Sequence, residues 1–246
     1  MRDHADEVVV ISKLGFYMIH YDDRLQELEL LVDTIIHRHE EKNIDYKSSM
    51  SWEDRDTKMM AIRCILGMAN LRYGGYIVFG VRQQGNDFIL DGMEQDHIKS
   101  FTQDNVDTDI KNYAEPFVEA TVTIVPRSIL KHKTESIPTE FLNDGGDFVV
   151  IQVKEFDELP VICKKAGKLK SGEIYIKEGA IYSRPRGKVE TSEIRTQTDM
   201  RELIDLAVDK NLRRLVDRME RIGITKLISP EFSDEERFNN QLGEVK

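Results

Sequence analysis

The spacing of apolar and polar positions changes along the chain and predicts helices that alternate irregularly with short strands. A short apolar run, Val8 to Ile11, opens the chain. Apolar residues then recur at three-to-four spacing between residues 22 and 41, namely Leu25, Leu28, Val32, Ile35 and Ile36. This spacing is typical of a helix that buries one stripe, and Asp22 or Asp23 can accept hydrogen bonds at its start. We expect residues 1–39 to form a strand and a helix that pack on the following domain.

The segment from Ala61 to Val81 joins a helical period to a strand period. Small and apolar residues at helical spacing lead to Asn70, Gly74-Gly75 supplies a turn, and Tyr76–Val81 is a continuous apolar run. The pattern predicts a helix that leads directly into a buried strand. A polar loop around Trp52 separates this helix from a short strand at Ile44–Lys47.

The central part of the chain predicts more short strands and one more helix. The expected elements are a strand at Phe88–Leu90 after a Gly85-Asn86 turn, a helix at Asp96–Tyr113, strands at Phe117–Val125 and Phe148–Val153, a surface excursion at Pro126–Gly146, and a hairpin of Glu173–Lys177 with Ala180–Ser183 about Glu178-Gly179. Because helices and strands do not alternate regularly, the predicted fold class is α+β, a mixed sheet flanked by helices.

A long amphipathic helix is predicted near the C-terminus, over residues 198–224. The residues expected on its buried side are Leu203, Leu206, Ala207, Leu215, Met219 and Ile222, and its polar face carries Arg213, Arg214, Arg218 and Arg221. Residues 225–246 show no reliable period and are interpreted as a polar tail or linker. We expect this helix to attach the domain to a second copy of the chain or to a partner protein.

Composition narrows the class of protein. With 246 residues, 40% hydrophobic content and a mean hydropathy of −0.45, the chain can bury a core and is expected to be soluble. No apolar run approaches the roughly 20 residues that span a bilayer, and no secretory signal is expected in the first residues. Cys64 and Cys163 are too few for a disulfide framework, so a cytoplasmic location is expected.

The net charge of −10 argues against indiscriminate binding to nucleic acid, which depends on releasing counterions from phosphates. Positive charge is nevertheless concentrated between residues 164 and 188, where eight basic residues face two glutamates, a net +6. The candidate nucleic-acid contacts in this stretch are Lys164, Lys165, Lys177, Arg184, Arg186 and Lys188. The alternative interpretation is a solvated charged face.

Several motifs together resemble the Schlafen AlbA_2 domain family, over roughly residues 40 to 191. They are the acidic-x4-acidic-aromatic-Lys strand of Glu40 and Asp45-Tyr46-Lys47, the Asn70, Gly74-Gly75 and Gly80-Val81 segment, Leu90-Asp91-Gly92, Glu158-Leu159-Pro160-Val161, and Ile174 to Ala180. The resemblance implies a mixed sheet flanked by helices, and we assign this domain to residues 40–197.

In nucleases of this family, three acids hold a divalent cation near a phosphodiester, where the metal activates water. The resemblance therefore implies Glu40, Asp45 and Asp87 as ligands of Mg²⁺ or Mn²⁺, with Lys47 completing the catalytic set as a phosphate contact. Asp87 is the candidate third acid because Arg82-Gln83-Gln84 stands where the family pattern has acids.

Three functions stay open. The first is a metal-dependent endonuclease that acts on tRNA-like or single-stranded RNA, in antiphage defence or regulation as the resemblance implies. The second is an inactive nucleic-acid-binding or regulatory module that lacks the third acid. The third is nucleotide (ATP) binding, although no Lys-Ser/Thr follows Gly74-Gly75 as a phosphate-binding loop requires. For Asn70, a structural role at the helix end is favoured over a role in the site.

Overall fold

The computed structural model describes residues 26–130, 133, 137–143, 145–185 and 189–222. The chain divides into two compact units, Met1–Met200 and Arg201–Lys246, which are described separately. The predicted strand at Val8–Ile11 and the predicted tail at 225–246 lie outside the described residues. Within the described part, no helix is both long and apolar enough to cross a membrane.

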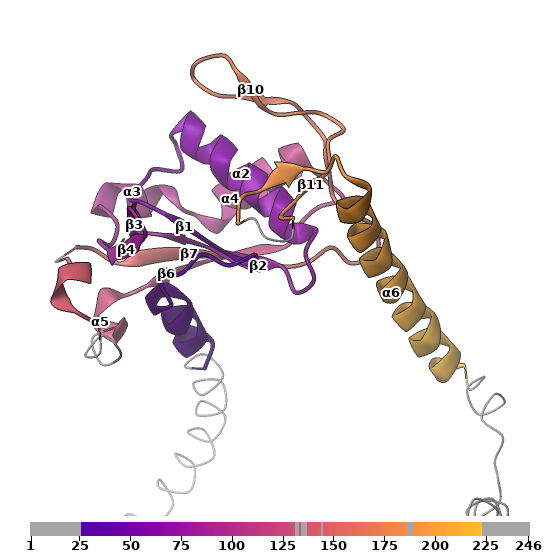
Figure 1. Ribbon diagram of the computed structural model, residues 1–246, viewed down its shortest axis with the longest axis horizontal. Helices are drawn as coiled ribbons and strands as arrows, with labels where there is room; N and C mark the ends of the chain where they lie inside the picture. Colours follow the sequence, from indigo (N-terminus) through magenta and orange to yellow (C-terminus); the bar gives the residue numbers. More distant parts are fainter. Residues whose placement is uncertain (1–25, 131–132, 134–136, 144, 186–188, 223–246) are drawn as a thin grey trace, which may run out of the picture. The chain divides into compact units, whose positions relative to one another are not determined.

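A four-stranded mixed sheet forms the centre of the first unit (Figure 1). Its order is β1 (Ile44–Lys47), β2 (Gly75–Phe79), β7 (Phe148–Val153) and β6 (Ala120–Val125). Strands β1 and β2 run parallel, joined through helix α2 (Arg55–Ala69), while β7 is antiparallel to both of its neighbours. The predicted α+β class and the mixed sheet are confirmed.

Short elements surround this sheet. Four two-stranded ladders pair β3 (Val81–Gln84) with β4 (Asp87–Leu90), β5 (Ala114–Glu115) with β8 (Ile162–Cys163), β9 (Gly167–Lys168) with β10 (Ile174–Ile176), and β11 (Tyr182–Ser183) with β12 (Ser192–Glu193). The remaining helical elements are α3 (Gln95–Ser100), α4 (Gln103–Tyr113), α5 (Arg127–Leu130) and the short 3-10 helix η2 (Thr139–Phe141).

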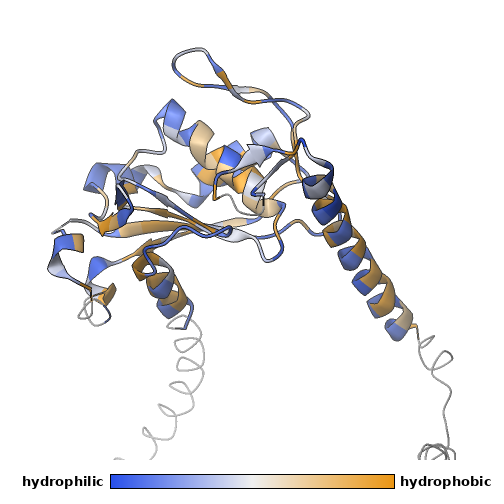
Figure 2. Cartoon of the chain, viewed as in Figure 1, coloured by the Kyte–Doolittle hydropathy of each residue, from blue (hydrophilic) through white to orange (hydrophobic). Residues whose placement is uncertain are grey.

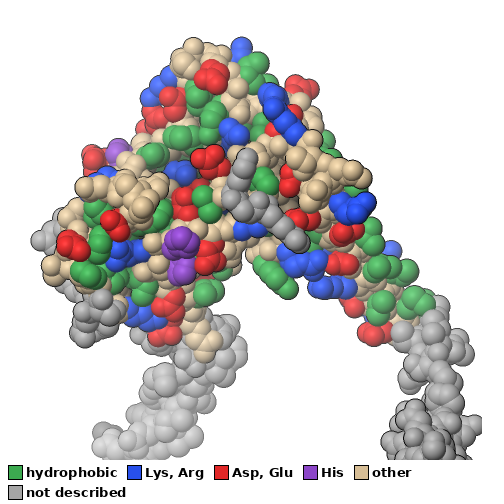
Figure 3. Space-filling model, in the orientation of Figure 1, with side chains coloured by type: hydrophobic (Ala, Val, Ile, Leu, Met, Phe, Trp, Pro, Cys, Tyr) green, Lys and Arg blue, Asp and Glu red, His purple; other side chains and the backbone are tan. Residues whose placement is uncertain are grey.

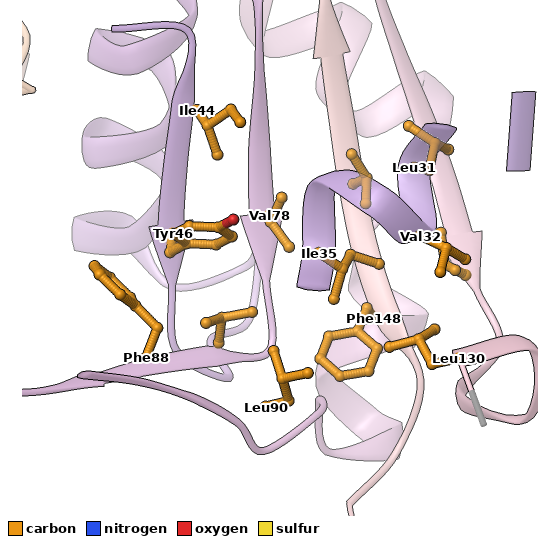
Figure 4. Packing of buried hydrophobic residues seen from close by; sticks show 13 residues of the cluster. Leu31, Val32, Ile35, Ile44, Tyr46, Val78, Phe88, Leu90, Leu130 and Phe148 are labelled. Carbon is orange, nitrogen blue, oxygen red and sulfur yellow. The ribbon is translucent and has the colours of Figure 1, made fainter. Parts of the chain in front are cut away.

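The two faces of the sheet are covered by different helices (Figure 1). A helix over residues 26–36 packs on one face, and α2 lies on the other. The first face carries a buried cluster (Figure 4) of Leu31, Val32, Ile35, Ile44, Tyr46, Val78, Val81, Phe88, Leu90, Val125, Leu130, Phe148 and Val150. Figure 2 shows the same concentration of hydrophobic residues along the central strands.

Two predicted boundaries were wrong because a backbone feature interrupts the period. The strand predicted at Tyr76–Val81 ends at Phe79, since Gly80 has a φ of +102° and turns the chain into β3. The helix predicted at Asp96–Tyr113 is two helices, because Thr102 accepts a hydrogen bond from the Asn105 N–H and caps α4.

Two other predictions also differ from the structure. The N-terminal helix ends at residue 36 rather than 41, so Glu40 lies in the connection to β1. The predicted hairpin about Glu178-Gly179 is a turn whose flanking strands pair elsewhere, β10 with β9 and β11 with β12. Strands of two or three residues carry too few side chains for the apolar pattern to specify their partner.

Helix α6 (Gln197–Arg221) confirms the predicted C-terminal helix and makes up most of the described part of the second unit. Leu203 and Leu206 are buried, as expected. Leu215 and Ile222 were predicted on the buried side as well, but they are 53% and 69% exposed. The prediction was wrong for this half of the helix.

Candidate nucleic-acid interface

Strand β1 places the predicted site residues opposite the apolar cluster. Ile44 and Tyr46 belong to the cluster that the N-terminal helix covers. Since side chains alternate along a strand, Asp45 and Lys47 project to the α2 face. There they line a cavity together with Met60, Arg63 and Cys64 of α2. The sequence correctly predicts that Asp45 and Lys47 share one face.

Asp45 is held in a buried ionic network. Its side chain is 7% exposed and forms salt bridges with Lys47 Nζ and, at 3.0 Å, with Arg184 Nη2. Arg184 is fully buried and also donates to the backbone oxygen of Val189. Its Nε and Nη1 atoms have no hydrogen-bond partner among the described residues. Each carboxylate oxygen of Asp45 therefore already contacts a cation.

Glu40 lies beside this network and is half-buried. Its Oε1 accepts a hydrogen bond from the backbone N–H of Tyr46 at 3.2 Å. Burial raises the pKa of Glu40, and the negative charge of Asp45 adds to that effect, while the Tyr46 N–H opposes it. Glu40 and Asp45 are therefore electrostatically coupled.

Lys47 stays charged despite its burial. Desolvation alone would lower its pKa, but the neighbouring groups outweigh that effect and the pKa is raised. Burial raises the pKa of Cys64 to about 12, so this thiol is neutral near pH 7 and Asp45 is the neighbour that stabilises the ammonium. With 21% of its side chain exposed, Lys47 is the member of the network that reaches solvent.

Two cavities adjoin at Arg63 and Tyr175. The smaller, of about 300 Å³, is lined by Asp45, Lys47, Met60, Arg63, Cys64, Tyr175, Glu190 and Thr191. The larger, of about 690 Å³, is lined by Arg63, Glu173, Ile174, Tyr175, Lys177, Tyr182, Pro185, Ser192, Glu193, Arg195, Thr196 and Asp199. Arg63 and Tyr175 line both, so these two side chains stand between the β1 network and the β10–β12 region.

Arg63 is the cation at the junction of the two cavities. Its guanidinium carbon lies 4.7 Å from the ring centre of Tyr175 and 5.5 Å from that of Tyr182. Its Nε is buried without a hydrogen-bond partner in the described part of the chain. Asn70 at the end of α2 fixes this region, since its amide donates to the backbone oxygens of Val161 and Tyr182. The structural role favoured for Asn70 is thus observed.

The three predicted metal ligands lie in different settings. Glu40 and Asp45 are neighbours, whereas Asp87 is exposed at the start of β4, opposite Gln84 of β3. Arg82, which stands in the family's acidic segment, forms an ion pair with Asp91 at 2.5 Å. No group of three or more His, Cys, Asp or Glu side chains among the described residues is arranged to hold a metal ion. The donor set does not fit a three-carboxylate site.

The predicted basic contacts also divide into separate groups. Lys164, Lys165 and Lys177 are exposed, whereas Arg184 is buried against Asp45 and cannot meet a ligand at the surface. Arg186 and Lys188 lie outside the described residues. Lys168 and Lys170 are exposed as well, on β9 and just after it. Figure 3 shows basic and acidic side chains interspersed on the face that it presents.

Sequence reasoning missed Arg63 and Tyr175. Arg63 is a charged residue between Ile62 and Cys64, which are both buried in α2. Tyr175 precedes the buried Ile176 on β10, so alternation turns it away from the core. A charged residue within an apolar helix and an aromatic residue in a basic segment were the available signals.

A Gly-rich phosphate-binding loop is not needed to explain Gly74-Gly75. Gly74 has a φ of +67°, and a Cβ atom there would lie 1.9 Å from the backbone oxygen of Val153. The turn requires glycine so that the chain can enter β2 beside β7. These glycines give no support to the nucleotide-binding alternative.

A family model described as Schlafen, AlbA_2 matches residues 40–186, more than half of the chain. The chain belongs to this family, and its membership supports a function related to nucleic acid. A similar solved structure is that of the DIP2311 protein from Corynebacterium diphtheriae, with 12% sequence identity and a TM-score of 0.38. The match covers 70% of this chain and 27% of that one. Comparison with curated proteins found no match.

Proposed function

We propose that this protein binds single-stranded RNA through the cavities at Arg63 and a neighbouring run of exposed lysines. We call the latter the lysine segment, defined as Lys164, Lys165, Lys168, Lys170 and Lys177. One observation carries the proposal: the lysine segment leads into the cavity lined by Lys177, Tyr175 and Arg63. Cationic surface beside an accessible aromatic ring suits a phosphate backbone with unpaired bases.

The ion pairs of the lysine segment do not oppose this role. Lys164 pairs with Glu115, Lys170 with Asp54 and Lys177 with Glu193, all with lysine side chains at least half exposed. Exposed pairs contribute only about 0–1 kcal/mol each, so a phosphate can replace the carboxylate at little cost. Lys165 and Lys168 form no ion pair with the described residues.

The larger cavity favours an uncharged group over a phosphate. Arg63, Lys177 and Arg195 line it together with Glu173, Glu193 and Asp199, so its formal charges cancel. A nucleobase is neutral, has hydrogen-bonding edges, and stacks on tyrosine or arginine planes. The proposed arrangement therefore has the phosphates on the lysine segment and a base against Tyr175.

Binding is tested by fluorescence anisotropy with a labelled 20-nucleotide RNA, its duplex and the matching DNA, titrated at several salt concentrations. The variant Lys165→Glu/Lys168→Glu should weaken binding about tenfold or more and lower the salt slope by about two units. Lys99→Glu/Lys154→Glu is the matched control, because it makes the same charge change at exposed lysines outside the segment. An unchanged salt slope would exclude the lysine segment as a contact with RNA. An absence of binding at low salt would exclude RNA binding as the function.

Metal-dependent RNA cleavage is the second candidate. It is favoured by Glu40, whose pKa is raised first by burial and then by the charge of Asp45, because a half-buried carboxylate of this kind gains from a nearby cation. Incubation of RNA with Mg²⁺ or Mn²⁺ should then give products that Glu40→Gln reduces, whereas Asp87→Asn, at the exposed start of β4, should not. RNA that is bound but remains intact with either metal would exclude cleavage and support the binding function.

A further inference from the structure

Helix α6 has two apolar faces, and only one of them is buried. At about 100° per residue, five side chains fall within a narrow arc, which we call the seam: Val208, Leu212, Leu215, Met219 and Ile222. The buried Leu203 and Leu206 lie on the opposite side of the helix. Figure 2 shows that apolar residues continue along α6 beyond these two. The seam is therefore not an extension of the buried face.

Four of the five seam residues are exposed although they are large hydrophobic side chains, and Met219 is half-buried. Val208, Leu212, Leu215 and Ile222 are between 49% and 69% exposed, and Ile204, which lies in line with the seam four residues before Val208, is 52% exposed. Soluble monomers rarely leave such a continuous apolar stripe in water, and one of this kind marks an interaction surface. Burying it would remove several side chains from water at once.

The spacing of the seam defines the kind of surface it fits. Its residues are separated by four, three, four and three positions, which is the a/d spacing of a heptad repeat. Such a stripe packs best into the same spacing on another helix, by knobs-into-holes contacts. A second copy of α6 supplies that spacing.

Charge selects the orientation of the second helix. Residues 197–209 hold four carboxylates and one arginine, a net −3, whereas residues 210–221 hold five basic and two acidic residues, a net +3. A parallel pair would place acid beside acid and base beside base. An antiparallel pair places each acidic half beside a basic half, which is electrostatically favourable.

We propose that two copies of this protein associate through their α6 helices, antiparallel, with the seam as the interface. In this register Val208 packs against Met219 of the second copy, and Leu212 packs against Leu215 of the second copy. Both layers repeat by the two-fold symmetry expected of such a dimer. The inference does not depend on RNA binding.

Sedimentation equilibrium of the full chain tests the association. Wild type should be a dimer at micromolar concentration, and Leu212→Glu/Leu215→Glu should raise the dissociation constant about tenfold or more. Glutamate keeps helix propensity, and equal helicity by circular dichroism would show that folding is intact. Arg213→Gln/Arg221→Gln is the control, since it changes the net charge equally at exposed positions away from the seam. A monomeric wild type, or a dimer unaffected by the seam variant, would overturn the proposal.

Cross-linking tests the orientation independently. Val208→Cys mixed with Met219→Cys should form a covalent dimer on mild oxidation, whereas Val208→Cys alone should not. The native Cys64 and Cys163 are buried, so wild type serves as the background. Cross-linking of Val208→Cys alone would indicate a parallel pair and contradict the charge argument. A monomer whose seam is protected from hydrogen exchange by residues 223–246 of its own chain would exclude the second copy.

Discussion

Strand β1 turns Ile44 and Tyr46 to one side and Asp45 and Lys47 to the other. Apolar packing stabilises the first side, and ion pairs stabilise the second. The first side is closed by Leu31, Val32 and Ile35 of the N-terminal helix, all at most 2% exposed. The second side buries charge, which carries a desolvation penalty that neutral side chains avoid. Its stability therefore depends on every charge keeping its partner.

This difference bears on function as well as on stability. The apolar side is filled and presents no polar group to a ligand, whereas the charged side opens through Lys47 into the cavity that contains Arg63. Placing the ionic network on a sheet strand fixes its geometry, because β1 is held by its ladder with β2. The apolar face thus supports the strand that carries the candidate site.

The sharpest way to break the comparison is to remove one charge from the buried network. Arg184→Met should lower the free energy of unfolding by about 3 to 5 kcal/mol, because Asp45 then keeps only Lys47 as a cationic partner. Chemical denaturation measures the change. In the triple variant Asp45→Asn/Lys47→Met/Arg184→Met every charge of this network is gone, so part of the loss should be recovered. A loss below about 1 kcal/mol for Arg184→Met would show that the network does not hold the fold together.

Truncating a side chain on the apolar face should lower the free energy of unfolding by a smaller amount. Removing a neighbouring charge should not restore this loss. Ile35→Ala removes a fully buried side chain of the cluster and should cost about 2 to 3 kcal/mol, through lost burial and the cavity that remains. Thermal and denaturant unfolding measure it. Leu30→Ala is the control on the same helix, since Leu30 is 51% exposed and should change little. Equal losses for the two variants would mean that this helix does not pack as described.

The apolar side of β1 could be predicted from the sequence more fully than the charged side. Alternation predicted β1 and the shared face of Asp45 and Lys47, because that pattern is local. Arg184 lies 139 residues from Asp45, and its basic neighbours suggested a surface contact rather than a buried partner. The hydrophobic period alone could not show the change of direction at Gly80, since that turn depends on a positive φ. On α6 the hydropathy pattern did not distinguish a buried stripe from an exposed one.

The smallest expected effect comes from Asp54, an acid that is also paired with a lysine but at the surface. Asp54 caps α2 by accepting from the Asp56 and Thr57 N–H groups, and Lys170 forms an ion pair with it. The hydrogen bond from Lys170 and that from Thr57 lower the pKa of Asp54 to about 2. Asp54→Ala should lower the free energy of unfolding by about 1 kcal/mol at pH 7, the usual contribution of a helix cap.

The pH dependence of the stability lost in Asp54→Ala provides the last test of this comparison. A carboxylate with a lowered pKa binds protons more weakly in the folded state, so its stabilisation is fully present above its ordinary pKa of 3.8. It is lost as the pH falls from about 4 to about 2. Wild type and Asp54→Ala should therefore differ in urea denaturation at pH 7 and converge near pH 2. Lys170→Met should reproduce only part of the loss, because the backbone hydrogen bonds of the cap remain. A difference that persists unchanged at low pH would show that Asp54 acts through its shape and not its charge.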